Sequence, residues 1–204
     1  HLFDEEEKQA KVLNILEECE KAGNPDMVYQ FCSTSKVTFA GAGIAALSSS
    51  PANIADIKSK VQWSTIGPDK INQLRHVRFF GDADGLREHM KKHAAIIRPK
   101  FEEVIETLDK ELSELEIAQW SHPTGGYFVS FDAMEGCAKK IVAKCKEAGL
   151  VLTGAGAAFP YGKDPKDSNI RIAPTMPTMD ELKEAMQLFI TCVKLVSVEK
   201  LLEA

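Results

Sequence analysis

The chain has little of what marks membrane, nucleic-acid-binding or metal-binding proteins. No apolar run among its 204 residues reaches the ~18 residues that a membrane-spanning helix needs. Basic residues number 25 against 30 acidic ones, so the net charge of −5 gives no basic footprint for nucleic acid. The five cysteines include no Cys-x-x-Cys pair, which argues against a zinc site and favours reduced thiols in a cytoplasmic protein. His89 and His93 have the spacing of a zinc pair on a helix, but a solvated helix face is the simpler interpretation.

What remains is an ordinary soluble composition in which strand-like and helical segments alternate. Hydrophobic residues make up 44% of the chain, enough for a sizeable core. Short β-prone apolar runs, the first two read as buried, lie at 27–33, 43–50, 125–133, 150–153 and 168–175. Helical patterns lie at 4–22, from Ser50 onward, within 64–80, at 84–115, at 135–149 and from Thr178 onward. Ser50 before a proline, and Thr178 three residues before a glutamate, are typical helix starts.

One lysine stands in an unusual setting. The segment "FCSTSKVTFAGAGIAAL" contains a single charge, Lys36, between an apolar strand and a glycine-rich turn. A lysine that leaves a buried strand is partly desolvated, which favours the free amine, and a free amine condenses with a carbonyl group. The hydroxyls of Ser33 and Ser35 and the open backbone of the glycine turn suit a phosphate-bearing aldehyde, of which pyridoxal phosphate is the common one. The simpler alternative is a loop lysine that points into water.

Three segments together resemble fold-type I pyridoxal-phosphate aminotransferases. "CSTSK" followed by "VTFAGAGIAAL" resembles their cofactor-lysine segment, and "PTGGYFVSFD" resembles a strand of their small domain. "SNIRIAPT" resembles the strand that carries the arginine for the substrate α-carboxylate. The order and spacing of the three match, so the likeness covers nearly the whole chain. "STIGPDKINQLRHVRFF" is similar to the aspartate-aminotransferase-like branch, which is sometimes grouped with the MocR aminotransferase domain.

The resemblance implies an α/β fold with two parts. Residues 1–85 would be the C-terminal remainder of the cofactor-binding large domain. Residues 86–204 would be the small C-terminal domain, entered by a long bridging helix. Relatives carry the aspartate that faces the pyridine nitrogen upstream of the first residue of this chain. We therefore expect the C-terminal half of an enzyme about twice as long, inactive as this piece alone.

The resemblance also assigns roles to individual residues. Lys36 corresponds to the Schiff-base lysine, Ser33 to the serine that contacts the cofactor phosphate, and Arg171 to the arginine that binds the substrate carboxylate. An arginine fork matches a carboxylate, and Arg171 stands in an apolar strand where it needs a partner, although a surface arginine on an edge strand is the alternative. Many relatives place an arginine for the phosphate where this chain has Gly43 and Ile44, so the phosphate needs positive charge from elsewhere.

The predicted function is a pyridoxal-phosphate-dependent aminotransferase that acts on aspartate or a related amino acid and a 2-oxo acid. A homodimer is expected, because the region from Trp63 to Phe80 matches the part that reaches a partner's site in relatives. Three alternatives stay open at this point: a lyase of the same fold, the ligand-sensing domain of a MocR-type regulator, and a scaffold without activity.

Overall fold

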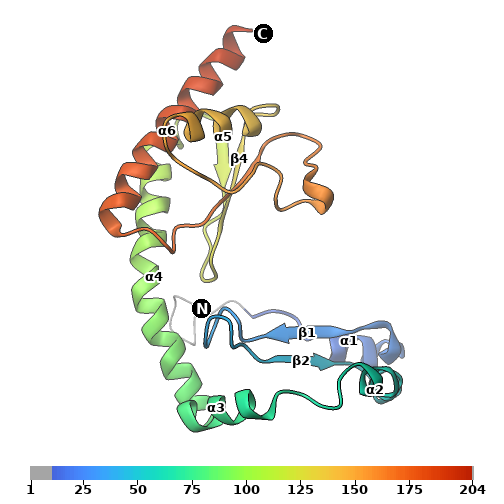
Figure 1. The fold of residues 1–204 in the computed structure, drawn as a ribbon. Helices are drawn as coiled ribbons and strands as arrows, with labels where there is room; N and C mark the ends of the chain where they lie inside the picture. The colour runs from blue at the N-terminus through green and yellow to red at the C-terminus, as the bar shows by residue number, and fades with distance from the viewer. Residues whose placement is uncertain (1–10, 204) are drawn as a thin grey trace. The chain divides into compact units, whose positions relative to one another are not determined.

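The computed structural model describes residues 11–203, which form two compact units, residues 11–92 and residues 93–203 (Figure 1). The boundary lies within a single continuous helix, α4 (Ala83–Leu112). The part of the chain that is described contains no helix long and apolar enough to cross a membrane.

The first unit is built on a two-stranded antiparallel sheet and several helices. Its elements are α1 (Ile15–Lys21), the 3₁₀ helix η2 (Pro25–Met27), β1 (Gln30–Ser33), β2 (Ala45–Ser48), α2 (Pro51–Ser64), α3 (Lys70–Phe80) and the start of α4. β1 and β2 lie side by side, with Gln30 opposite Ser48 and Ser33 opposite Ala45 (Figure 1). The loop that joins these strands carries Lys36. Of the helix predicted at 4–22, residues 4–10 lie outside the described residues, residues 11–14 are not helical, and α1 covers Ile15–Lys21.

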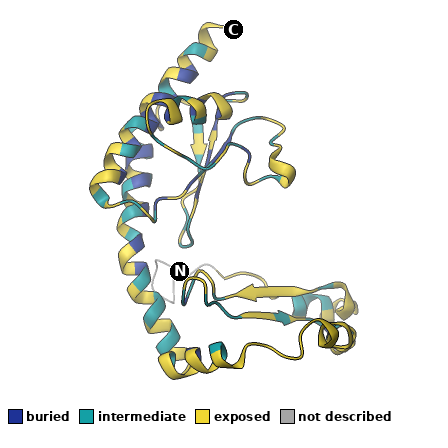
Figure 2. Cartoon of the chain, in the orientation of Figure 1, coloured by how far each residue is buried: buried dark blue, intermediate teal, exposed yellow. Residues whose placement is uncertain are grey.

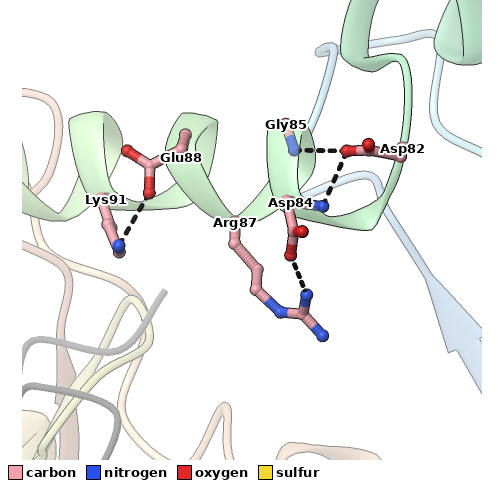
Figure 3. Close-up of polar contacts among 6 residues, drawn as sticks. All are labelled: Asp82, Asp84, Gly85, Arg87, Glu88 and Lys91. Carbon is pink, nitrogen blue, oxygen red and sulfur yellow. Dashed lines mark hydrogen bonds and ion pairs between the residues drawn. The ribbon is translucent and has the colours of Figure 1, made fainter.

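Short-range polar contacts set the helix starts in this unit. Ser50 accepts a hydrogen bond from the Asn53 amide at 3.2 Å and caps α2, with Pro51 at the first helical position, as the sequence predicted. Asp69 caps α3 in the same way. Asp82 then accepts from the amides of Asp84 and Gly85 at 3.0 and 2.9 Å and begins α4 (Figure 3). These contacts explain why the helix positions were readable from the sequence.

The prediction of a buried strand at 27–33 is wrong in two respects. The strand covers only residues 30–33, because Pro25–Met27 forms a 3₁₀ turn. All four of its residues are exposed, and the Phe31 side chain is 74% exposed. Within the described residues β1 pairs only with β2, so apolar side chains on this sheet lie in the open (Figure 2). An apolar strand sequence predicts burial, but the strand is buried only where neighbouring elements cover it.

The second unit is a three-stranded antiparallel sheet packed against helices. Its elements are the rest of α4, β3 (Ala118–Trp120), β4 (Val129–Ala133), α5 (Ala138–Glu147), the 3₁₀ helix η3 (Pro160–Gly162), β5 (Asn169–Ile172) and α6 (Met179–Leu202). The strand order is β3-β4-β5. Figure 2 shows dark blue, buried residues along α4, β4 and α6.

Periodicity places the core of this unit. Along β4, Val129 and Phe131 are fully buried while Ser130 and Asp132 are exposed, as the two-residue period of a strand requires. The buried residues of α4 recur every three or four positions, including Val104 and Leu108 with no exposed surface. The ring of Phe131 packs edge-to-face on that of Phe189 from α6, with centroids 5.0 Å apart.

In this unit one predicted strand is absent and one strand was not predicted. Residues 150–153 form no strand, because the Leu150 amide donates to the Cys145 carbonyl at 2.8 Å and closes the end of α5. Gly149, with φ +96°, permits that reversal. β3 was not predicted, since its three residues gain strand geometry only by pairing with β4. The capping box at Thr178 and Glu181 is confirmed at the start of α6.

Candidate active site

Lys36 lies in one helical turn directly after β1. The amides of Val37 and Thr38 both donate to the Thr34 carbonyl, at 2.8 and 2.9 Å, so residues 34–38 fold back on themselves. Lys36 is exposed in this unit. We expected a buried strand to desolvate Lys36, but that strand is itself exposed.

Ser33 and Ser35, the predicted phosphate contacts, lie together beside Lys36. Their hydroxyl oxygens are 2.7 Å apart, and Ser33 Oγ also accepts from the Ser35 amide at 3.1 Å. One hydroxyl proton is used between the two side chains. The other has no acceptor in the described part of the chain, and both residues are exposed. The pair can therefore donate one hydrogen bond to an anionic oxygen.

The glycine turn closes tightly on this serine pair. A Cβ placed on Gly43 would lie 2.6 Å from Ser35 Oγ and 2.9 Å from the Ser35 backbone nitrogen, so no side chain fits there. Next to it, the Ile44 amide donates to Thr34 Oγ1 and the Ile44 carbonyl accepts from the Thr34 amide, both at 2.8 Å. This backbone excludes an arginine at position 43, the first of the two positions where many relatives carry one. The close approach of this backbone to Ser35 is what requires glycine at position 43.

Arg171 lies in β5 of the second unit, opposite Ser130 in β4. Its neighbours Ile170 and Ile172 are buried in the core, so the half-buried Arg171 points to the other face of the sheet. The centre of its guanidinium is 4.3 Å from the centroid of the Phe128 ring, a cation–π distance. The Nε atom is buried without a hydrogen-bond partner among the described residues.

A buried, unsatisfied guanidinium donor is costly, so this site calls for an acceptor. A carboxylate is the natural one, because its two oxygens match the arginine fork. Lys100 in α4 supports the site by donating to the Thr175 and Pro177 carbonyls at 2.9 and 2.6 Å, which holds the segment that follows β5.

Sequence reasoning missed Phe128. Its signal was the period of β4: Val129 faces the core, so the residue before it faces the same side as Arg171 on the neighbouring strand. Lys36 and the two serines thus form one candidate site in the first unit, and Arg171 and Phe128 form a separate candidate site in the second unit. Within residues 11–203 no group of three or more His, Cys, Asp or Glu residues could hold a metal ion.

Comparison with known proteins identifies a family for this chain. A sequence profile of the family described as aspartate amino-transferase matches residues 1–204. The aspartate aminotransferase of Corynebacterium glutamicum is 46% identical over 189 residues, which are 93% of this chain and 44% of that protein. The crystal structure of an aspartate transaminase from Corynebacterium glutamicum superposes with a TM-score of 0.93 at 44% identity, covering 98% of this chain and 47% of that one.

A more distant structure shares the fold. LysN, an α-aminoadipate aminotransferase of Thermus thermophilus, superposes with a TM-score of 0.75 at 19% identity over 96% of this chain and 48% of its own. LysN was crystallised with N-(5'-phosphopyridoxyl)-L-leucine. The chain spans less than half the length of the relatives named here. The profile match, together with the 46% identity, shows that this chain is a member of the aspartate amino-transferase family, with the fold-type I architecture that the sequence predicted.

Proposed function

We propose that the protein is a pyridoxal-phosphate-dependent transaminase that moves an amino group between aspartate, or a related amino acid, and a 2-oxo acid. In this proposal residues 1–85 belong to the cofactor-binding large domain and residues 86–204 to the small domain. The observation that carries it is the Lys36 turn closed on the Ser33–Ser35 pair, in a chain of this family. The names of its relatives supply the substrate class.

The residues of the candidate site in the first unit fit the cofactor. Lys36 Nζ would hold the cofactor aldehyde covalently, with loss of one water, and the serine pair would donate a hydrogen bond to its phosphate. Pyridoxal phosphate supplies an electron sink for the carbon that loses its proton. Lys36 Nζ, when not bound to the cofactor, would serve as the general base that takes the substrate α-proton.

The candidate site in the second unit fits the substrate. Arg171 would bind the α-carboxylate through its fork, and the unsatisfied Nε would gain an acceptor. Phe128 would keep the guanidinium plane in place by stacking on it. Because every amino acid and its 2-oxo product carry this carboxylate, one arginine would serve both halves of the reaction.

Borohydride trapping tests the role of Lys36. The protein at its full natural length is incubated with pyridoxal phosphate, reduced with sodium borohydride and digested. We expect the cofactor mass on the peptide that contains Lys36, and none in a Lys36→Ala variant; Lys58→Ala, a change at an exposed helix lysine, is the matched control. Cofactor found on another lysine in the unmodified protein would refute the assignment.

We also propose a homodimer. Apolar side chains stand in the open along α2 and the loop after it: Val61, Trp63 and Ile66 are 47%, 85% and 104% exposed. Such side chains favour a covering partner, and a second copy of the chain is the partner that the resemblance implies. Sedimentation of the full-length protein should give twice the monomer mass, whereas a fully active monomer would contradict the proposal.

A cytoplasmic location belongs to the same proposal. All five cysteines lie within the described residues, and each is a free thiol. Free thiols are typical of a reducing compartment.

A further inference from the structure

A buried histidine and threonine lie in contact in the first unit, 38 residues apart in the sequence. Thr38 and His76 are only 9% and 6% exposed, and His76 Nε2 is 2.8 Å from Thr38 Oγ1. The other ring nitrogen, Nδ1, lies 2.9 Å from the Asn72 carbonyl. A carbonyl oxygen can only accept, so Nδ1 carries a proton, and in the neutral ring Nε2 is an acceptor for the Thr38 hydroxyl.

Aromatic rings enclose this contact. The Phe39 ring meets the His76 ring edge-on with centroids 5.1 Å apart, and the Phe80 ring lies 5.9 Å from it. Phe79 packs against both phenylalanines, with centroids 5.1 and 4.9 Å away. Water has little access to the ring, so His76 Nε2 needs the Thr38 hydroxyl as its partner, while that hydroxyl also lies within hydrogen-bond distance of Thr34.

Thr38 belongs to the turn that carries Lys36. Its amide donates to the Thr34 carbonyl, and its Oγ1 lies 3.0 Å from Thr34 Oγ1 and 3.2 Å from the Thr34 carbonyl oxygen. Thr34 in turn is tied to Ile44 at the far end of the loop. A displacement of Thr38 would therefore pass directly to the residues on both sides of Lys36.

A second residue on the same face of α3 also binds the loop that carries Lys36. Asn72 lies one turn before His76 in α3, and its Nδ2 donates to the Ala42 carbonyl at 2.9 Å, with the Gly43 carbonyl at 3.3 Å. Asn72 thus fixes the glycine turn after Lys36 while His76 fixes the turn that contains it. Neither function can be read from the sequence around Lys36, since both residues lie in a different element.

We propose that His76, with Asn72, is a positioning residue that sets the turn from which Lys36 reaches the cofactor. The inference rests on the proposed role of Lys36. It assigns to α3 the task of holding the amine in one place, which a rigid loop needs if its side chain is to capture an aldehyde efficiently. A purely structural pair would stabilise the unit without changing that capture.

Matched substitutions at Thr38 distinguish the effect of its hydroxyl from the effect of its side-chain shape. Thr38→Val keeps the shape and removes the hydroxyl, and Thr38→Ser keeps the hydroxyl. Thr191→Val, at an exposed threonine of α6 that donates to its own helix, is the control for the change itself. Each full-length apoprotein is mixed with pyridoxal phosphate, and the rate of covalent capture is followed by absorbance and by borohydride adduct on the Lys36 peptide.

The Val variant at position 38 should capture the cofactor about tenfold more slowly, the effect of one lost hydrogen bond in a buried site. The Ser variant, which retains the hydroxyl at position 38, should stay within about twofold of the unmodified protein. The Thr191→Val control should also stay within about twofold, because it removes a hydroxyl of the other unit and leaves the Lys36 turn unchanged. Capture by Thr38→Val at the normal rate, or an equal loss in Thr38→Ser, would overturn the inference.

A second pair keeps the test decisive if the Val variant does not fold. His76→Gln retains an acceptor for Thr38 and should restore most of the capture rate that His76→Leu loses. Equal rates for these two variants, in proteins with the same unfolding midpoint, would overturn the positioning role. If the adduct of the unmodified protein forms on a lysine other than Lys36, the proposed function fails; an adduct on Lys36 at equal rates in all variants refutes only the inference about His76.

Discussion

Replacement of Phe128 by leucine tests whether the ring acts through Arg171. Leucine keeps an apolar side chain but removes the π face that lies 4.3 Å from the guanidinium centre. A cation–π contact is worth about 0.5–1 kcal/mol where it is exposed and about 2 kcal/mol where it is desolvated. Phe128 is 41% exposed, which places it toward the lower figure. We therefore expect a loss of about two- to fivefold in kcat/KM for aspartate.

Substrate choice makes this measurement specific. The loss should appear for aspartate and for the 2-oxo acid, because both offer Arg171 a carboxylate. A primary amine without a carboxylate should react at its usual, slow rate in the variant. Phe128→Tyr retains the ring face and serves as the matched control, with a change of less than about twofold.

Three results would contradict a cation–π role for Phe128. One is unchanged kinetics for aspartate in Phe128→Leu. Another is an equal loss with the carboxylate-free amine, which would mean that the ring shapes the site in general. The third is a loss in Phe128→Tyr as large as in Phe128→Leu, because the cation–π face would then be irrelevant.

Three further substitutions and one labelling experiment test other contacts of the structure. Arg171→Lys keeps the charge but loses the fork, so kcat/KM for aspartate should fall by about 10- to 100-fold, the value of a hydrogen bond between charged groups; near-normal kinetics would make Arg171 structural. Lys100→Met leaves two carbonyls after β5 without their charged donor and should lower the unfolding free energy in urea by about 1–3 kcal/mol, whereas Lys110→Met, at an exposed position on the same helix, should not. The hydrogen bond from the backbone amide of the α6 N-cap lowers the pKa of Glu181, so Glu181→Gln should destabilise the protein at neutral pH; that difference should fade as the pH falls through the pKa of the folded carboxyl, and a difference that grew in acid would contradict this. Burial raises the pKa of the Cys145 thiol to about 12, so it should stay unlabelled by a thiol reagent at pH 8 until the protein is unfolded, and rapid labelling of the native protein would show that α5 is not packed as described.

Local signals predicted local structure well. The capping box of α6 involves residues three positions apart, and the long helix predicted at 84–115 is found at Ala83–Leu112. Both depend on contacts within one or two turns, which a single segment of sequence specifies. Predictions that depend on contacts beyond that range were less accurate. Three residues form β3 only by pairing with β4, and the apolar run predicted as a strand at 150–153 instead closes the end of α5.

The same distinction holds for the site. Ser33, Ser35 and Lys36 were identified because they are neighbours in the sequence, and the structure places the two hydroxyls 2.7 Å apart. The contact between Thr38 and His76 spans 38 residues and has no local pattern, so no reading of the loop alone could have found it. Phe128 is an intermediate case: strand alternation predicts which side of the sheet its ring faces, but not that Arg171 lies against it.

The exposure of Lys36 changes the reason why this lysine is suited to hold a cofactor. From the sequence we expected a buried strand to desolvate Lys36, but both β1 and Lys36 are exposed. What the first unit does provide is a fixed position: the turn is closed on Thr34, the loop ends are tied through Ile44, and α3 holds both sides. Holding a reacting group in place raises its effective concentration by many orders of magnitude, whether or not its proton affinity changes. On this view the substitutions that damage capture most are those that loosen the loop, such as Gly43→Ala, whose added Cβ would lie 2.6 Å from Ser35 Oγ. Capture as fast in Gly43→Ala as in the unmodified protein would show that the position of the turn is not what matters.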